Sequence, residues 1–174
     1  ISRFWAQRVN WSEAKQQYVM LGVTGPNEYE NNVNNNFHTN RMAQWTLRYT
    51  LEAIDFMKKN HADTYAGLVK KWNLDETTEL SKWAYIIEKM YFPFDEERGV
   101  FLQQDGFLDK DLTPAAQLPV EERPLNKNWS WDRILRSCYI KQADTLQSIF
   151  LYENEFDKET IRRHFDFYEP ITVH

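Results

Sequence analysis

Residues 37–60 read Phe37-His-Thr-Asn-Arg-Met-Ala-Gln-Trp-Thr-Leu-Arg-Tyr-Thr-Leu-Glu-Ala-Ile-Asp-Phe-Met-Lys-Lys-Asn60, and they decide the fold class. Apolar residues recur in this stretch at the three- and four-residue spacing of an α-helix. One stripe consists of Ala43, Leu47, Leu51 and Ile54, and a second group beside it of Met42, Trp45, Tyr49 and Met57. Such a wide apolar face predicts one long helix that is buried on two sides.

Outward from this helix, the rest of the chain also favours helices. The 174 residues contain only 5 Gly and 6 Pro, so the sequence offers few breakpoints. Further helices are predicted at 1–10, 75–91, 138–154 and 158–168, with Asp75 and Asp157 as N-caps. A short apolar run at 18–24 leans toward a strand, and 95–130 is an irregular connection. We therefore expect an all-α fold, and long helices joined by elaborate loops suit an α/α toroid.

Composition excludes several classes of function. Hydrophobic residues make up 42% and charged residues 27%, as in ordinary globular proteins. The net charge of −5 comes with no basic stripe, so we expect no nucleic-acid partner and no membrane partner. The single Cys138 allows no internal disulfide, which favours a cytoplasmic protein. The four histidines are scattered without a His-x-x-x-His pair, so we predict no metal site. The chain starts without Met and stops in an apolar stretch, so we expect a fragment of a larger protein.

The segment 23–36 is the sharpest local feature: Val-Thr-Gly-Pro-Asn-Glu-Tyr-Glu-Asn-Asn-Val-Asn-Asn-Asn. Side-chain amides at this density compete with backbone hydrogen bonds, so the segment is predicted to be a loop. Carboxylates among amides suit recognition of sugar hydroxyls, which both donate and accept hydrogen bonds. If the loop is extended, Glu28 and Glu30 face opposite ways, and only one can enter a given site. An asparagine-rich capping loop without catalytic function would have the same composition.

A second feature lies at Asn126-Lys-Asn-Trp-Ser-Trp-Asp-Arg133, followed by Lys141 and Gln142. Trp129 and Trp131 alternate with polar residues, as in a loop that presents aromatic rings. Lys141 near a helix start could hydrogen-bond a hydroxyl or a phosphate. The alternative is a solvated lysine at a helix end with the tryptophans in the core.

Three segments together resemble glycoside hydrolase family 65, which contains phosphorylases of α-glucosyl disaccharides. They are Thr24-Gly-Pro-Asn-Glu-Tyr29 with its Asn tail, Ile140-Lys-Gln-Ala-Asp144, and Phe167-Tyr-Glu-Pro-Ile-Thr-Val-His174. Their order and spacing fit the family, and the likeness extends over essentially the whole chain. Residues 121–133 are most similar to the branch of the family that acts on maltose.

The resemblance implies that residues 1–174 are part of an (α/α)6 barrel catalytic domain in a larger multidomain enzyme. It implies that Glu28 is the general acid and that Lys141 and Gln142 contact the glucosyl unit. The reaction would be inverting phosphorolysis of maltose to β-glucose 1-phosphate and glucose. Inorganic phosphate would be a co-substrate, no cofactor is expected, and the parent would be a homodimer. The phosphate-binding loop would lie largely beyond His174, and Glu30 is expected to be structural or at most a hydroxyl contact.

Two alternatives stay open. Within the family, the enzyme could phosphorolyse trehalose, kojibiose or nigerose, or hydrolyse its substrate; the acceptor subsite decides this. Outside enzymes, a non-catalytic carbohydrate-binding helical module would use exposed Trp and Asn equally well, although binding alone needs no acid at Glu28. We also expect the isolated fragment to be inactive, because part of a barrel exposes apolar helix faces.

Overall fold

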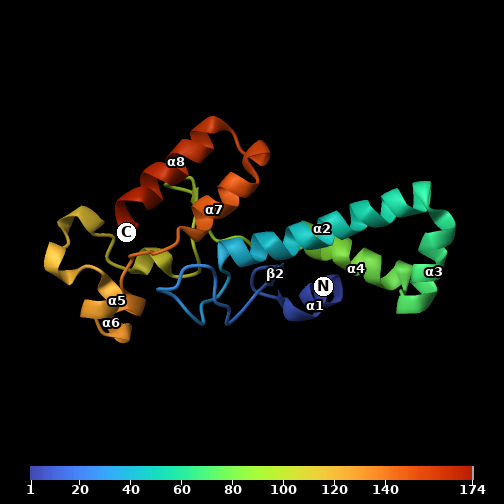
Figure 1. Ribbon diagram of the computed structural model, residues 1–174, viewed down its shortest axis with the longest axis horizontal. Coiled ribbons are helices and arrows are strands. Elements are labelled where there is room, and N and C mark those ends of the chain that lie inside the picture. The colour runs from blue at the N-terminus through green and yellow to red at the C-terminus, as the bar shows by residue number, and fades with distance from the viewer. Residues whose placement is uncertain (174) are drawn as a thin grey trace. The chain divides into compact units, whose positions relative to one another are not determined.

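A computed structural model describes residues 1–173, so His174, the last residue of the third family segment, lies outside the described residues. The chain is mainly helical, which confirms the all-α class (Figure 1). It divides into two compact units. The first comprises residues 1–19 and 40–91, and the second comprises residues 20–39 and the chain from Phe92 onward. Within the described residues, no helix is long and apolar enough to cross a membrane.

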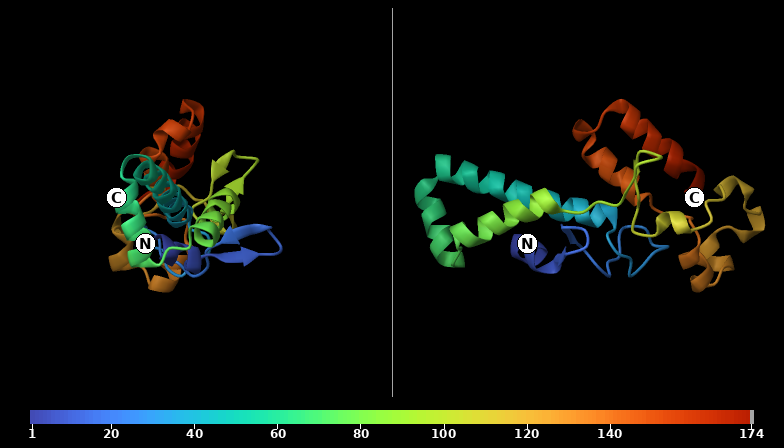
Figure 2. Two further views of the ribbon diagram at one scale, coloured as in Figure 1. Left: turned by 90° about the vertical axis from the view of Figure 1, so that its right-hand side faces the viewer. Right: turned by 180° about the vertical axis from the view of Figure 1, so that it is seen from behind.

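The first unit is built around two helices that run side by side in opposite directions (Figures 1 and 2). Its elements are α1 (Ser2–Arg8), the hairpin β1 (Asn10–Ser12) and β2 (Gln17–Val19), most of α2 (Phe37–Asn60), α3 (Ala62–Trp72) and α4 (Glu76–Lys89). The two antiparallel helices are α2 and α4, and the Gln44 side-chain amide of α2 donates to the Ile87 carbonyl of α4 at 2.8 Å. The predicted helices at 1–10, 37–60 and 75–91 are confirmed, whereas α3 was not predicted.

The long helix α2 is buried on one side only within its unit. Ala43 and Leu47 of the first stripe are fully buried, as predicted. In the second group, the rings of Trp45 and Tyr49 stack at 5.1 Å, and these residues are 38% and 56% exposed. The prediction of burial on two sides is therefore wrong for the chain as it stands.

The second unit combines short strands, turns and two packed helices. Its regular elements are β3 (Phe94–Asp95), β4 (Val100–Phe101), α5 (Leu125–Asn128), α6 (Trp131–Arg136), α7 (Asp144–Leu151) and α8 (Lys158–Tyr168). Short 3-10 turns lie at 107–109, 115–117, 120–122, 153–155 and 169–171. Helices α7 and α8 lie against each other (Figure 2). Tyr168 at the end of α8 is fully buried, and its hydroxyl donates to the Phe101 carbonyl at 2.7 Å.

The predicted helix 138–154 begins six residues late, at Asp144, and ends at Leu151. Cys138, Tyr139 and Ile140 are buried instead in the apolar core of the second unit. Ile140 forms a parallel bridge with Thr172, and its carbonyl accepts from the Val173 N–H at 2.9 Å. These backbone hydrogen bonds with a distant segment replace those of a helical turn, so the residues just before α7 are extended.

Candidate active site

The segment that carries Glu28 is a turn. The Glu30 N–H donates to the Asn27 carbonyl at 3.2 Å, so the loop prediction is confirmed but the extended conformation considered for it is wrong. Gly25 precedes the turn in a crowded position, where a Cβ atom would collide with the side chains of Asp144 and Asn36. Only glycine lets the chain pass this close.

The side chains of Glu28, Lys141 and Gln142 lie together. The Glu28 N–H donates to Gln142 Oε1 at 2.9 Å, and Gln142 Nε2 donates to Glu28 Oε1 at 3.0 Å. The ammonium of Lys141 forms an ion pair with the other carboxylate oxygen of Glu28. The three residues named from the sequence are thus neighbours in space, and we call them the Glu28–Lys141–Gln142 trio.

The Lys141 ammonium holds the pKa of Glu28 below its ordinary value, through its hydrogen bond first and its charge second. The same pair raises the pKa of Lys141. The Glu28 side chain is 63% exposed, so a ligand can reach it. A carboxylate, an ammonium and an amide within hydrogen-bonding distance of one another offer both donors and acceptors to a polyhydroxylated ligand.

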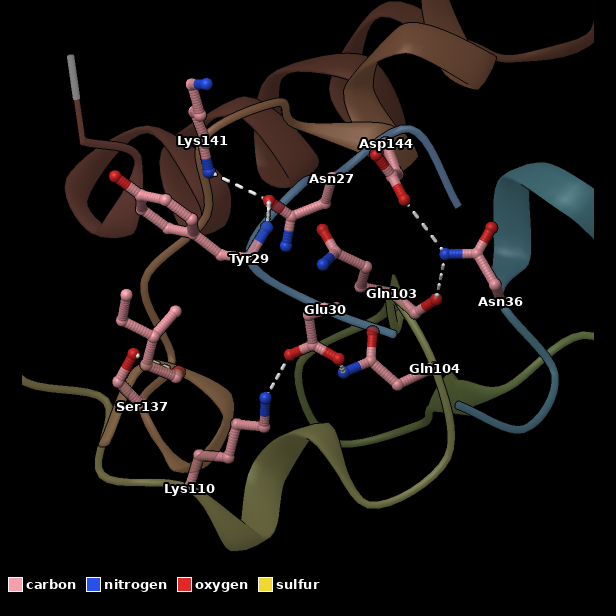
Figure 3. Close-up of polar contacts among 11 residues, drawn as sticks. Asn27, Tyr29, Glu30, Asn36, Gln103, Gln104, Lys110, Ser137, Lys141 and Asp144 are labelled. Atoms are coloured by element: carbon pink, nitrogen blue, oxygen red, sulfur yellow. Dashed lines mark hydrogen bonds and ion pairs between the residues drawn. The ribbon is translucent and has the colours of Figure 1, made fainter. Parts of the chain in front are cut away.

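Asn27 joins the two segments that carry the trio. It is fully buried, and its Oδ1 accepts from the Lys141 N–H at 2.9 Å and from the Tyr29 N–H at 3.3 Å (Figure 3). A buried amide that satisfies two backbone donors fixes the turn firmly. Asn27 was not predicted to be a site residue, although it stands directly before Glu28 in the family segment.

Glu30 has the opposite environment from Glu28. Its side chain is 6% exposed and accepts from Lys110 Nζ and Gln104 Nε2 (Figure 3). The side chains of Glu28 and Glu30 therefore lie in different surroundings, although a turn rather than an extended chain separates the two residues. This buried ion pair gives Glu30 a structural contact.

The tryptophan motif does not present two free rings. Trp129 is half-buried against the core of the unit, its Nε1 donates to Glu122 at 2.6 Å, and the Arg133 guanidinium lies 3.6 Å from its ring centre. Trp131 is the first residue of α6 and is 47% exposed. The core alternative therefore holds for Trp129.

A pocket of about 230 Å³ adjoins the trio. Lys141 and Gln142 line it together with Tyr29, Arg123 and Asn126. Arg123 and Asn126 come from the stretch 95–130, so this irregular connection contributes to the surroundings of the two residues. Asn126 belongs to the tryptophan motif described from the sequence, but neither Arg123 nor Asn126 was predicted to be a site residue.

The description of the central catalytic domain of glycosyl hydrolase family 65 matches residues 1–174. The chain belongs to this family.

Several family 65 proteins are similar over essentially the whole chain. Maltose phosphorylase of Bacillus subtilis (strain 168) is 52% identical over 100% of this chain. Kojibiose phosphorylase of Halothermothrix orenii is 34% identical over 99%. A solved structure from the human microbiome, provisionally named a kojibiose phosphorylase, is 34% identical with a TM-score of 0.86 and covers 99% of this chain and 23% of its own. The chain spans 22% of the length of both curated relatives.

Proposed function

We propose that this chain is part of the catalytic domain of an inverting α-glucoside phosphorylase, that its substrate is maltose, and that Glu28 is the general acid. The observation that supports this best is the Glu28–Lys141–Gln142 trio, in a chain 52% identical to a maltose phosphorylase and only 34% identical to a kojibiose phosphorylase. By the family relationship, the parent chain would form an (α/α)6 barrel and a homodimer in the cytoplasm.

The chemistry needs one carboxylic acid and one nucleophile. Glu28 donates a proton to the glycosidic oxygen as its bond to the anomeric carbon breaks, and glucose leaves. Phosphate attacks the anomeric carbon from the opposite face, so the α-glucoside gives β-glucose 1-phosphate. A hydrolase needs a second carboxylate to activate water, whereas phosphate is already an anion at neutral pH. Lys141 and Gln142 would meanwhile hydrogen-bond hydroxyls of the glucosyl unit, and no cofactor is needed.

The ion pair with Lys141 favours the ionised form of Glu28, whereas the mechanism requires the protonated form. A general acid must carry its proton near neutral pH, which a raised pKa favours. In this structure Lys141 instead lowers the pKa of Glu28. If Lys141 turns to a sugar hydroxyl when the disaccharide binds, Glu28 loses this cation and is desolvated by the sugar. Both changes raise the pKa of Glu28 and favour the protonated acid.

This requirement gives a pH prediction for the full-length enzyme. Replacing Lys141 with Met removes the cation that lowers the pKa of Glu28, so this pKa should rise. Activity falls as pH rises through the pKa of the acid, so the alkaline limb of kcat/KM should move to higher pH. The KM for the disaccharide should rise as well. Lys127→Met, at an exposed lysine of α5, is the control; an alkaline limb that stays in place in Lys141→Met would contradict this coupling.

The proposed reaction is tested directly on the full-length protein. Maltose is incubated with and without inorganic phosphate, and the product anomer is followed by NMR. Phosphate-dependent formation of β-glucose 1-phosphate is the expected result. Glucose formed without phosphate would mean a hydrolase. Turnover of trehalose, kojibiose or nigerose in preference to maltose would keep the chemistry and correct the substrate.

A further inference from the structure

Asp144 is a fully buried acidic residue behind the Glu28–Lys141–Gln142 trio. It is the first residue of α7, and its N–H donates to the Gln142 carbonyl at 2.9 Å. Its Oδ2 accepts from Asn36 Nδ2 at 2.9 Å (Figure 3). The same carboxyl oxygen lies against Gly25, three residues before Glu28, and the Asn27 backbone lowers the pKa of the carboxyl group. One buried side chain thus contacts both segments of the trio.

The partners of Asp144 are themselves anchored. Asn36 Oδ1 accepts from the Thr39 N–H at 2.9 Å and so caps the start of α2. Asn27 accepts from the Lys141 N–H through its own side chain. Asp144 and Asn36 pack so closely against Gly25 that there is no room for a side chain at position 25. The Asp144 carboxyl therefore lies at the junction of the Glu28 turn, the first turn of α2 and the start of α7.

The surroundings of the Asp144 carboxyl group favour its protonated form far more than those of an exposed aspartate do. Among residues 1–173, no lysine or arginine is paired with Asp144, and its Oδ1 has no hydrogen-bond partner. Burial raises its pKa to about 7, and the nearby charge of Glu30 adds to this effect. A buried carboxyl group without a cation is most stable when it is protonated.

We propose that Asp144 is a positioning residue: its buried carboxyl group holds the turn at Asn27 against the start of α7, and so fixes Glu28 beside Lys141 and Gln142. The inference rests on the proposed function, because it takes Glu28 as the acid. Asp144 itself would transfer no proton to the substrate. Its contribution is to the alignment of Glu28, on which the rate of proton donation depends steeply.

The test compares Asp144→Asn and Asp144→Ala in the full-length enzyme. Asparagine keeps the oxygen that accepts from Asn36, so kcat should stay within about threefold of wild type. Alanine removes the contact, and kcat should fall by about a hundredfold, the typical cost of a small misalignment. KM should change little, because Lys141 and Gln142 remain. Asp132→Ala, at an exposed aspartate paired with Arg136 on the surface, is the matched control and should be unchanged.

The outcomes separate this inference from the proposed function. An inactive wild-type enzyme would overturn the function. An active wild type with an equally active Asp144→Ala would overturn the positioning role, and so would an Asp144→Asn variant as inactive as Glu28→Gln, because that result would make Asp144 a proton donor. If Asp144→Ala fails to fold, Gly25→Ala supplies a second perturbation. Its added methyl displaces Asp144 and Asn36, and it should lower kcat more than it changes KM.

Discussion

Replacing Glu28 with Gln in the full-length enzyme should lower kcat for phosphorolysis by about a thousandfold, within the range that general acid catalysis contributes. Glutamine has nearly the same size as glutamate but cannot donate a carboxyl proton to the glycosidic oxygen. Because the Glu28 side chain is 63% exposed, the melting temperature should hardly change. Steady-state kinetics with maltose and phosphate, together with a thermal unfolding scan, measures both quantities.

A second substrate shows whether the loss lies in proton donation. Fluoride leaves without being protonated, so Glu28→Gln should retain far more activity on α-glucosyl fluoride with phosphate than on maltose. Equal losses on both substrates would point to a damaged site instead. Glu30→Gln provides the internal comparison within the same turn. If Glu30→Gln abolished turnover and Glu28→Gln did not, the assignment of the acid would be wrong.

Of the variants proposed here, Lys110→Met, which removes the cation paired with Glu30, should lower the free energy of unfolding most. In Lys110→Met, Glu30 keeps its contact with Gln104 but loses its buried cation. The side chain of Lys110 is 14% exposed and that of Glu30 is 6% exposed. Breaking a buried ion pair by removing one partner typically costs about 3–5 kcal/mol of the free energy of unfolding. Urea unfolding of the full-length protein, followed through the catalytic domain, measures this loss.

Two control variants identify the cause of the loss. Lys59→Met removes an exposed partner of Asp55 and should cost about 1 kcal/mol at most. The double variant Glu30→Leu with Lys110→Met replaces both charges by apolar groups and should recover much of the stability, since no unpaired charge stays buried. If Lys110→Met is no more destabilising than Lys59→Met, the pair does not behave as a buried one.

Local patterns in the sequence predicted much of the helical structure. Periodicity located α2, and two aspartates marked helix starts correctly. Asp75 accepts from the Thr78 N–H at 3.0 Å, and Asp157 accepts from the Thr160 N–H at 2.6 Å. The start of α7 was placed wrongly, because the backbone before it pairs with residues 171–173, and no local pattern reveals that pairing.

Local sequence patterns predicted less of the candidate site than of the helices. Composition indicated only a polar loop around Glu28, and the link to Lys141 and Gln142 came from the family resemblance. The ion pair between Glu30 and Lys110 joins residues 80 apart and was not predicted. Lys110 lies in an irregular stretch with no periodicity that would assign it a face. Asp144 belonged to a recognised segment, but its burial follows from how three segments pack.

The distance along the chain between Glu28 and Lys141 also bears on how the protein is made. The two residues are 113 positions apart. A ribosome must therefore deliver everything between them before their ion pair can form, and contacts of such long range form slowly. The segment 40–91, which belongs to the first unit, leaves the ribosome in the meantime. Its helices can form from local contacts before Lys141 and Gln142, the partners of Glu28, have been synthesised. The ion pair between Glu28 and Lys141 therefore forms only after all of the residues between them have been synthesised.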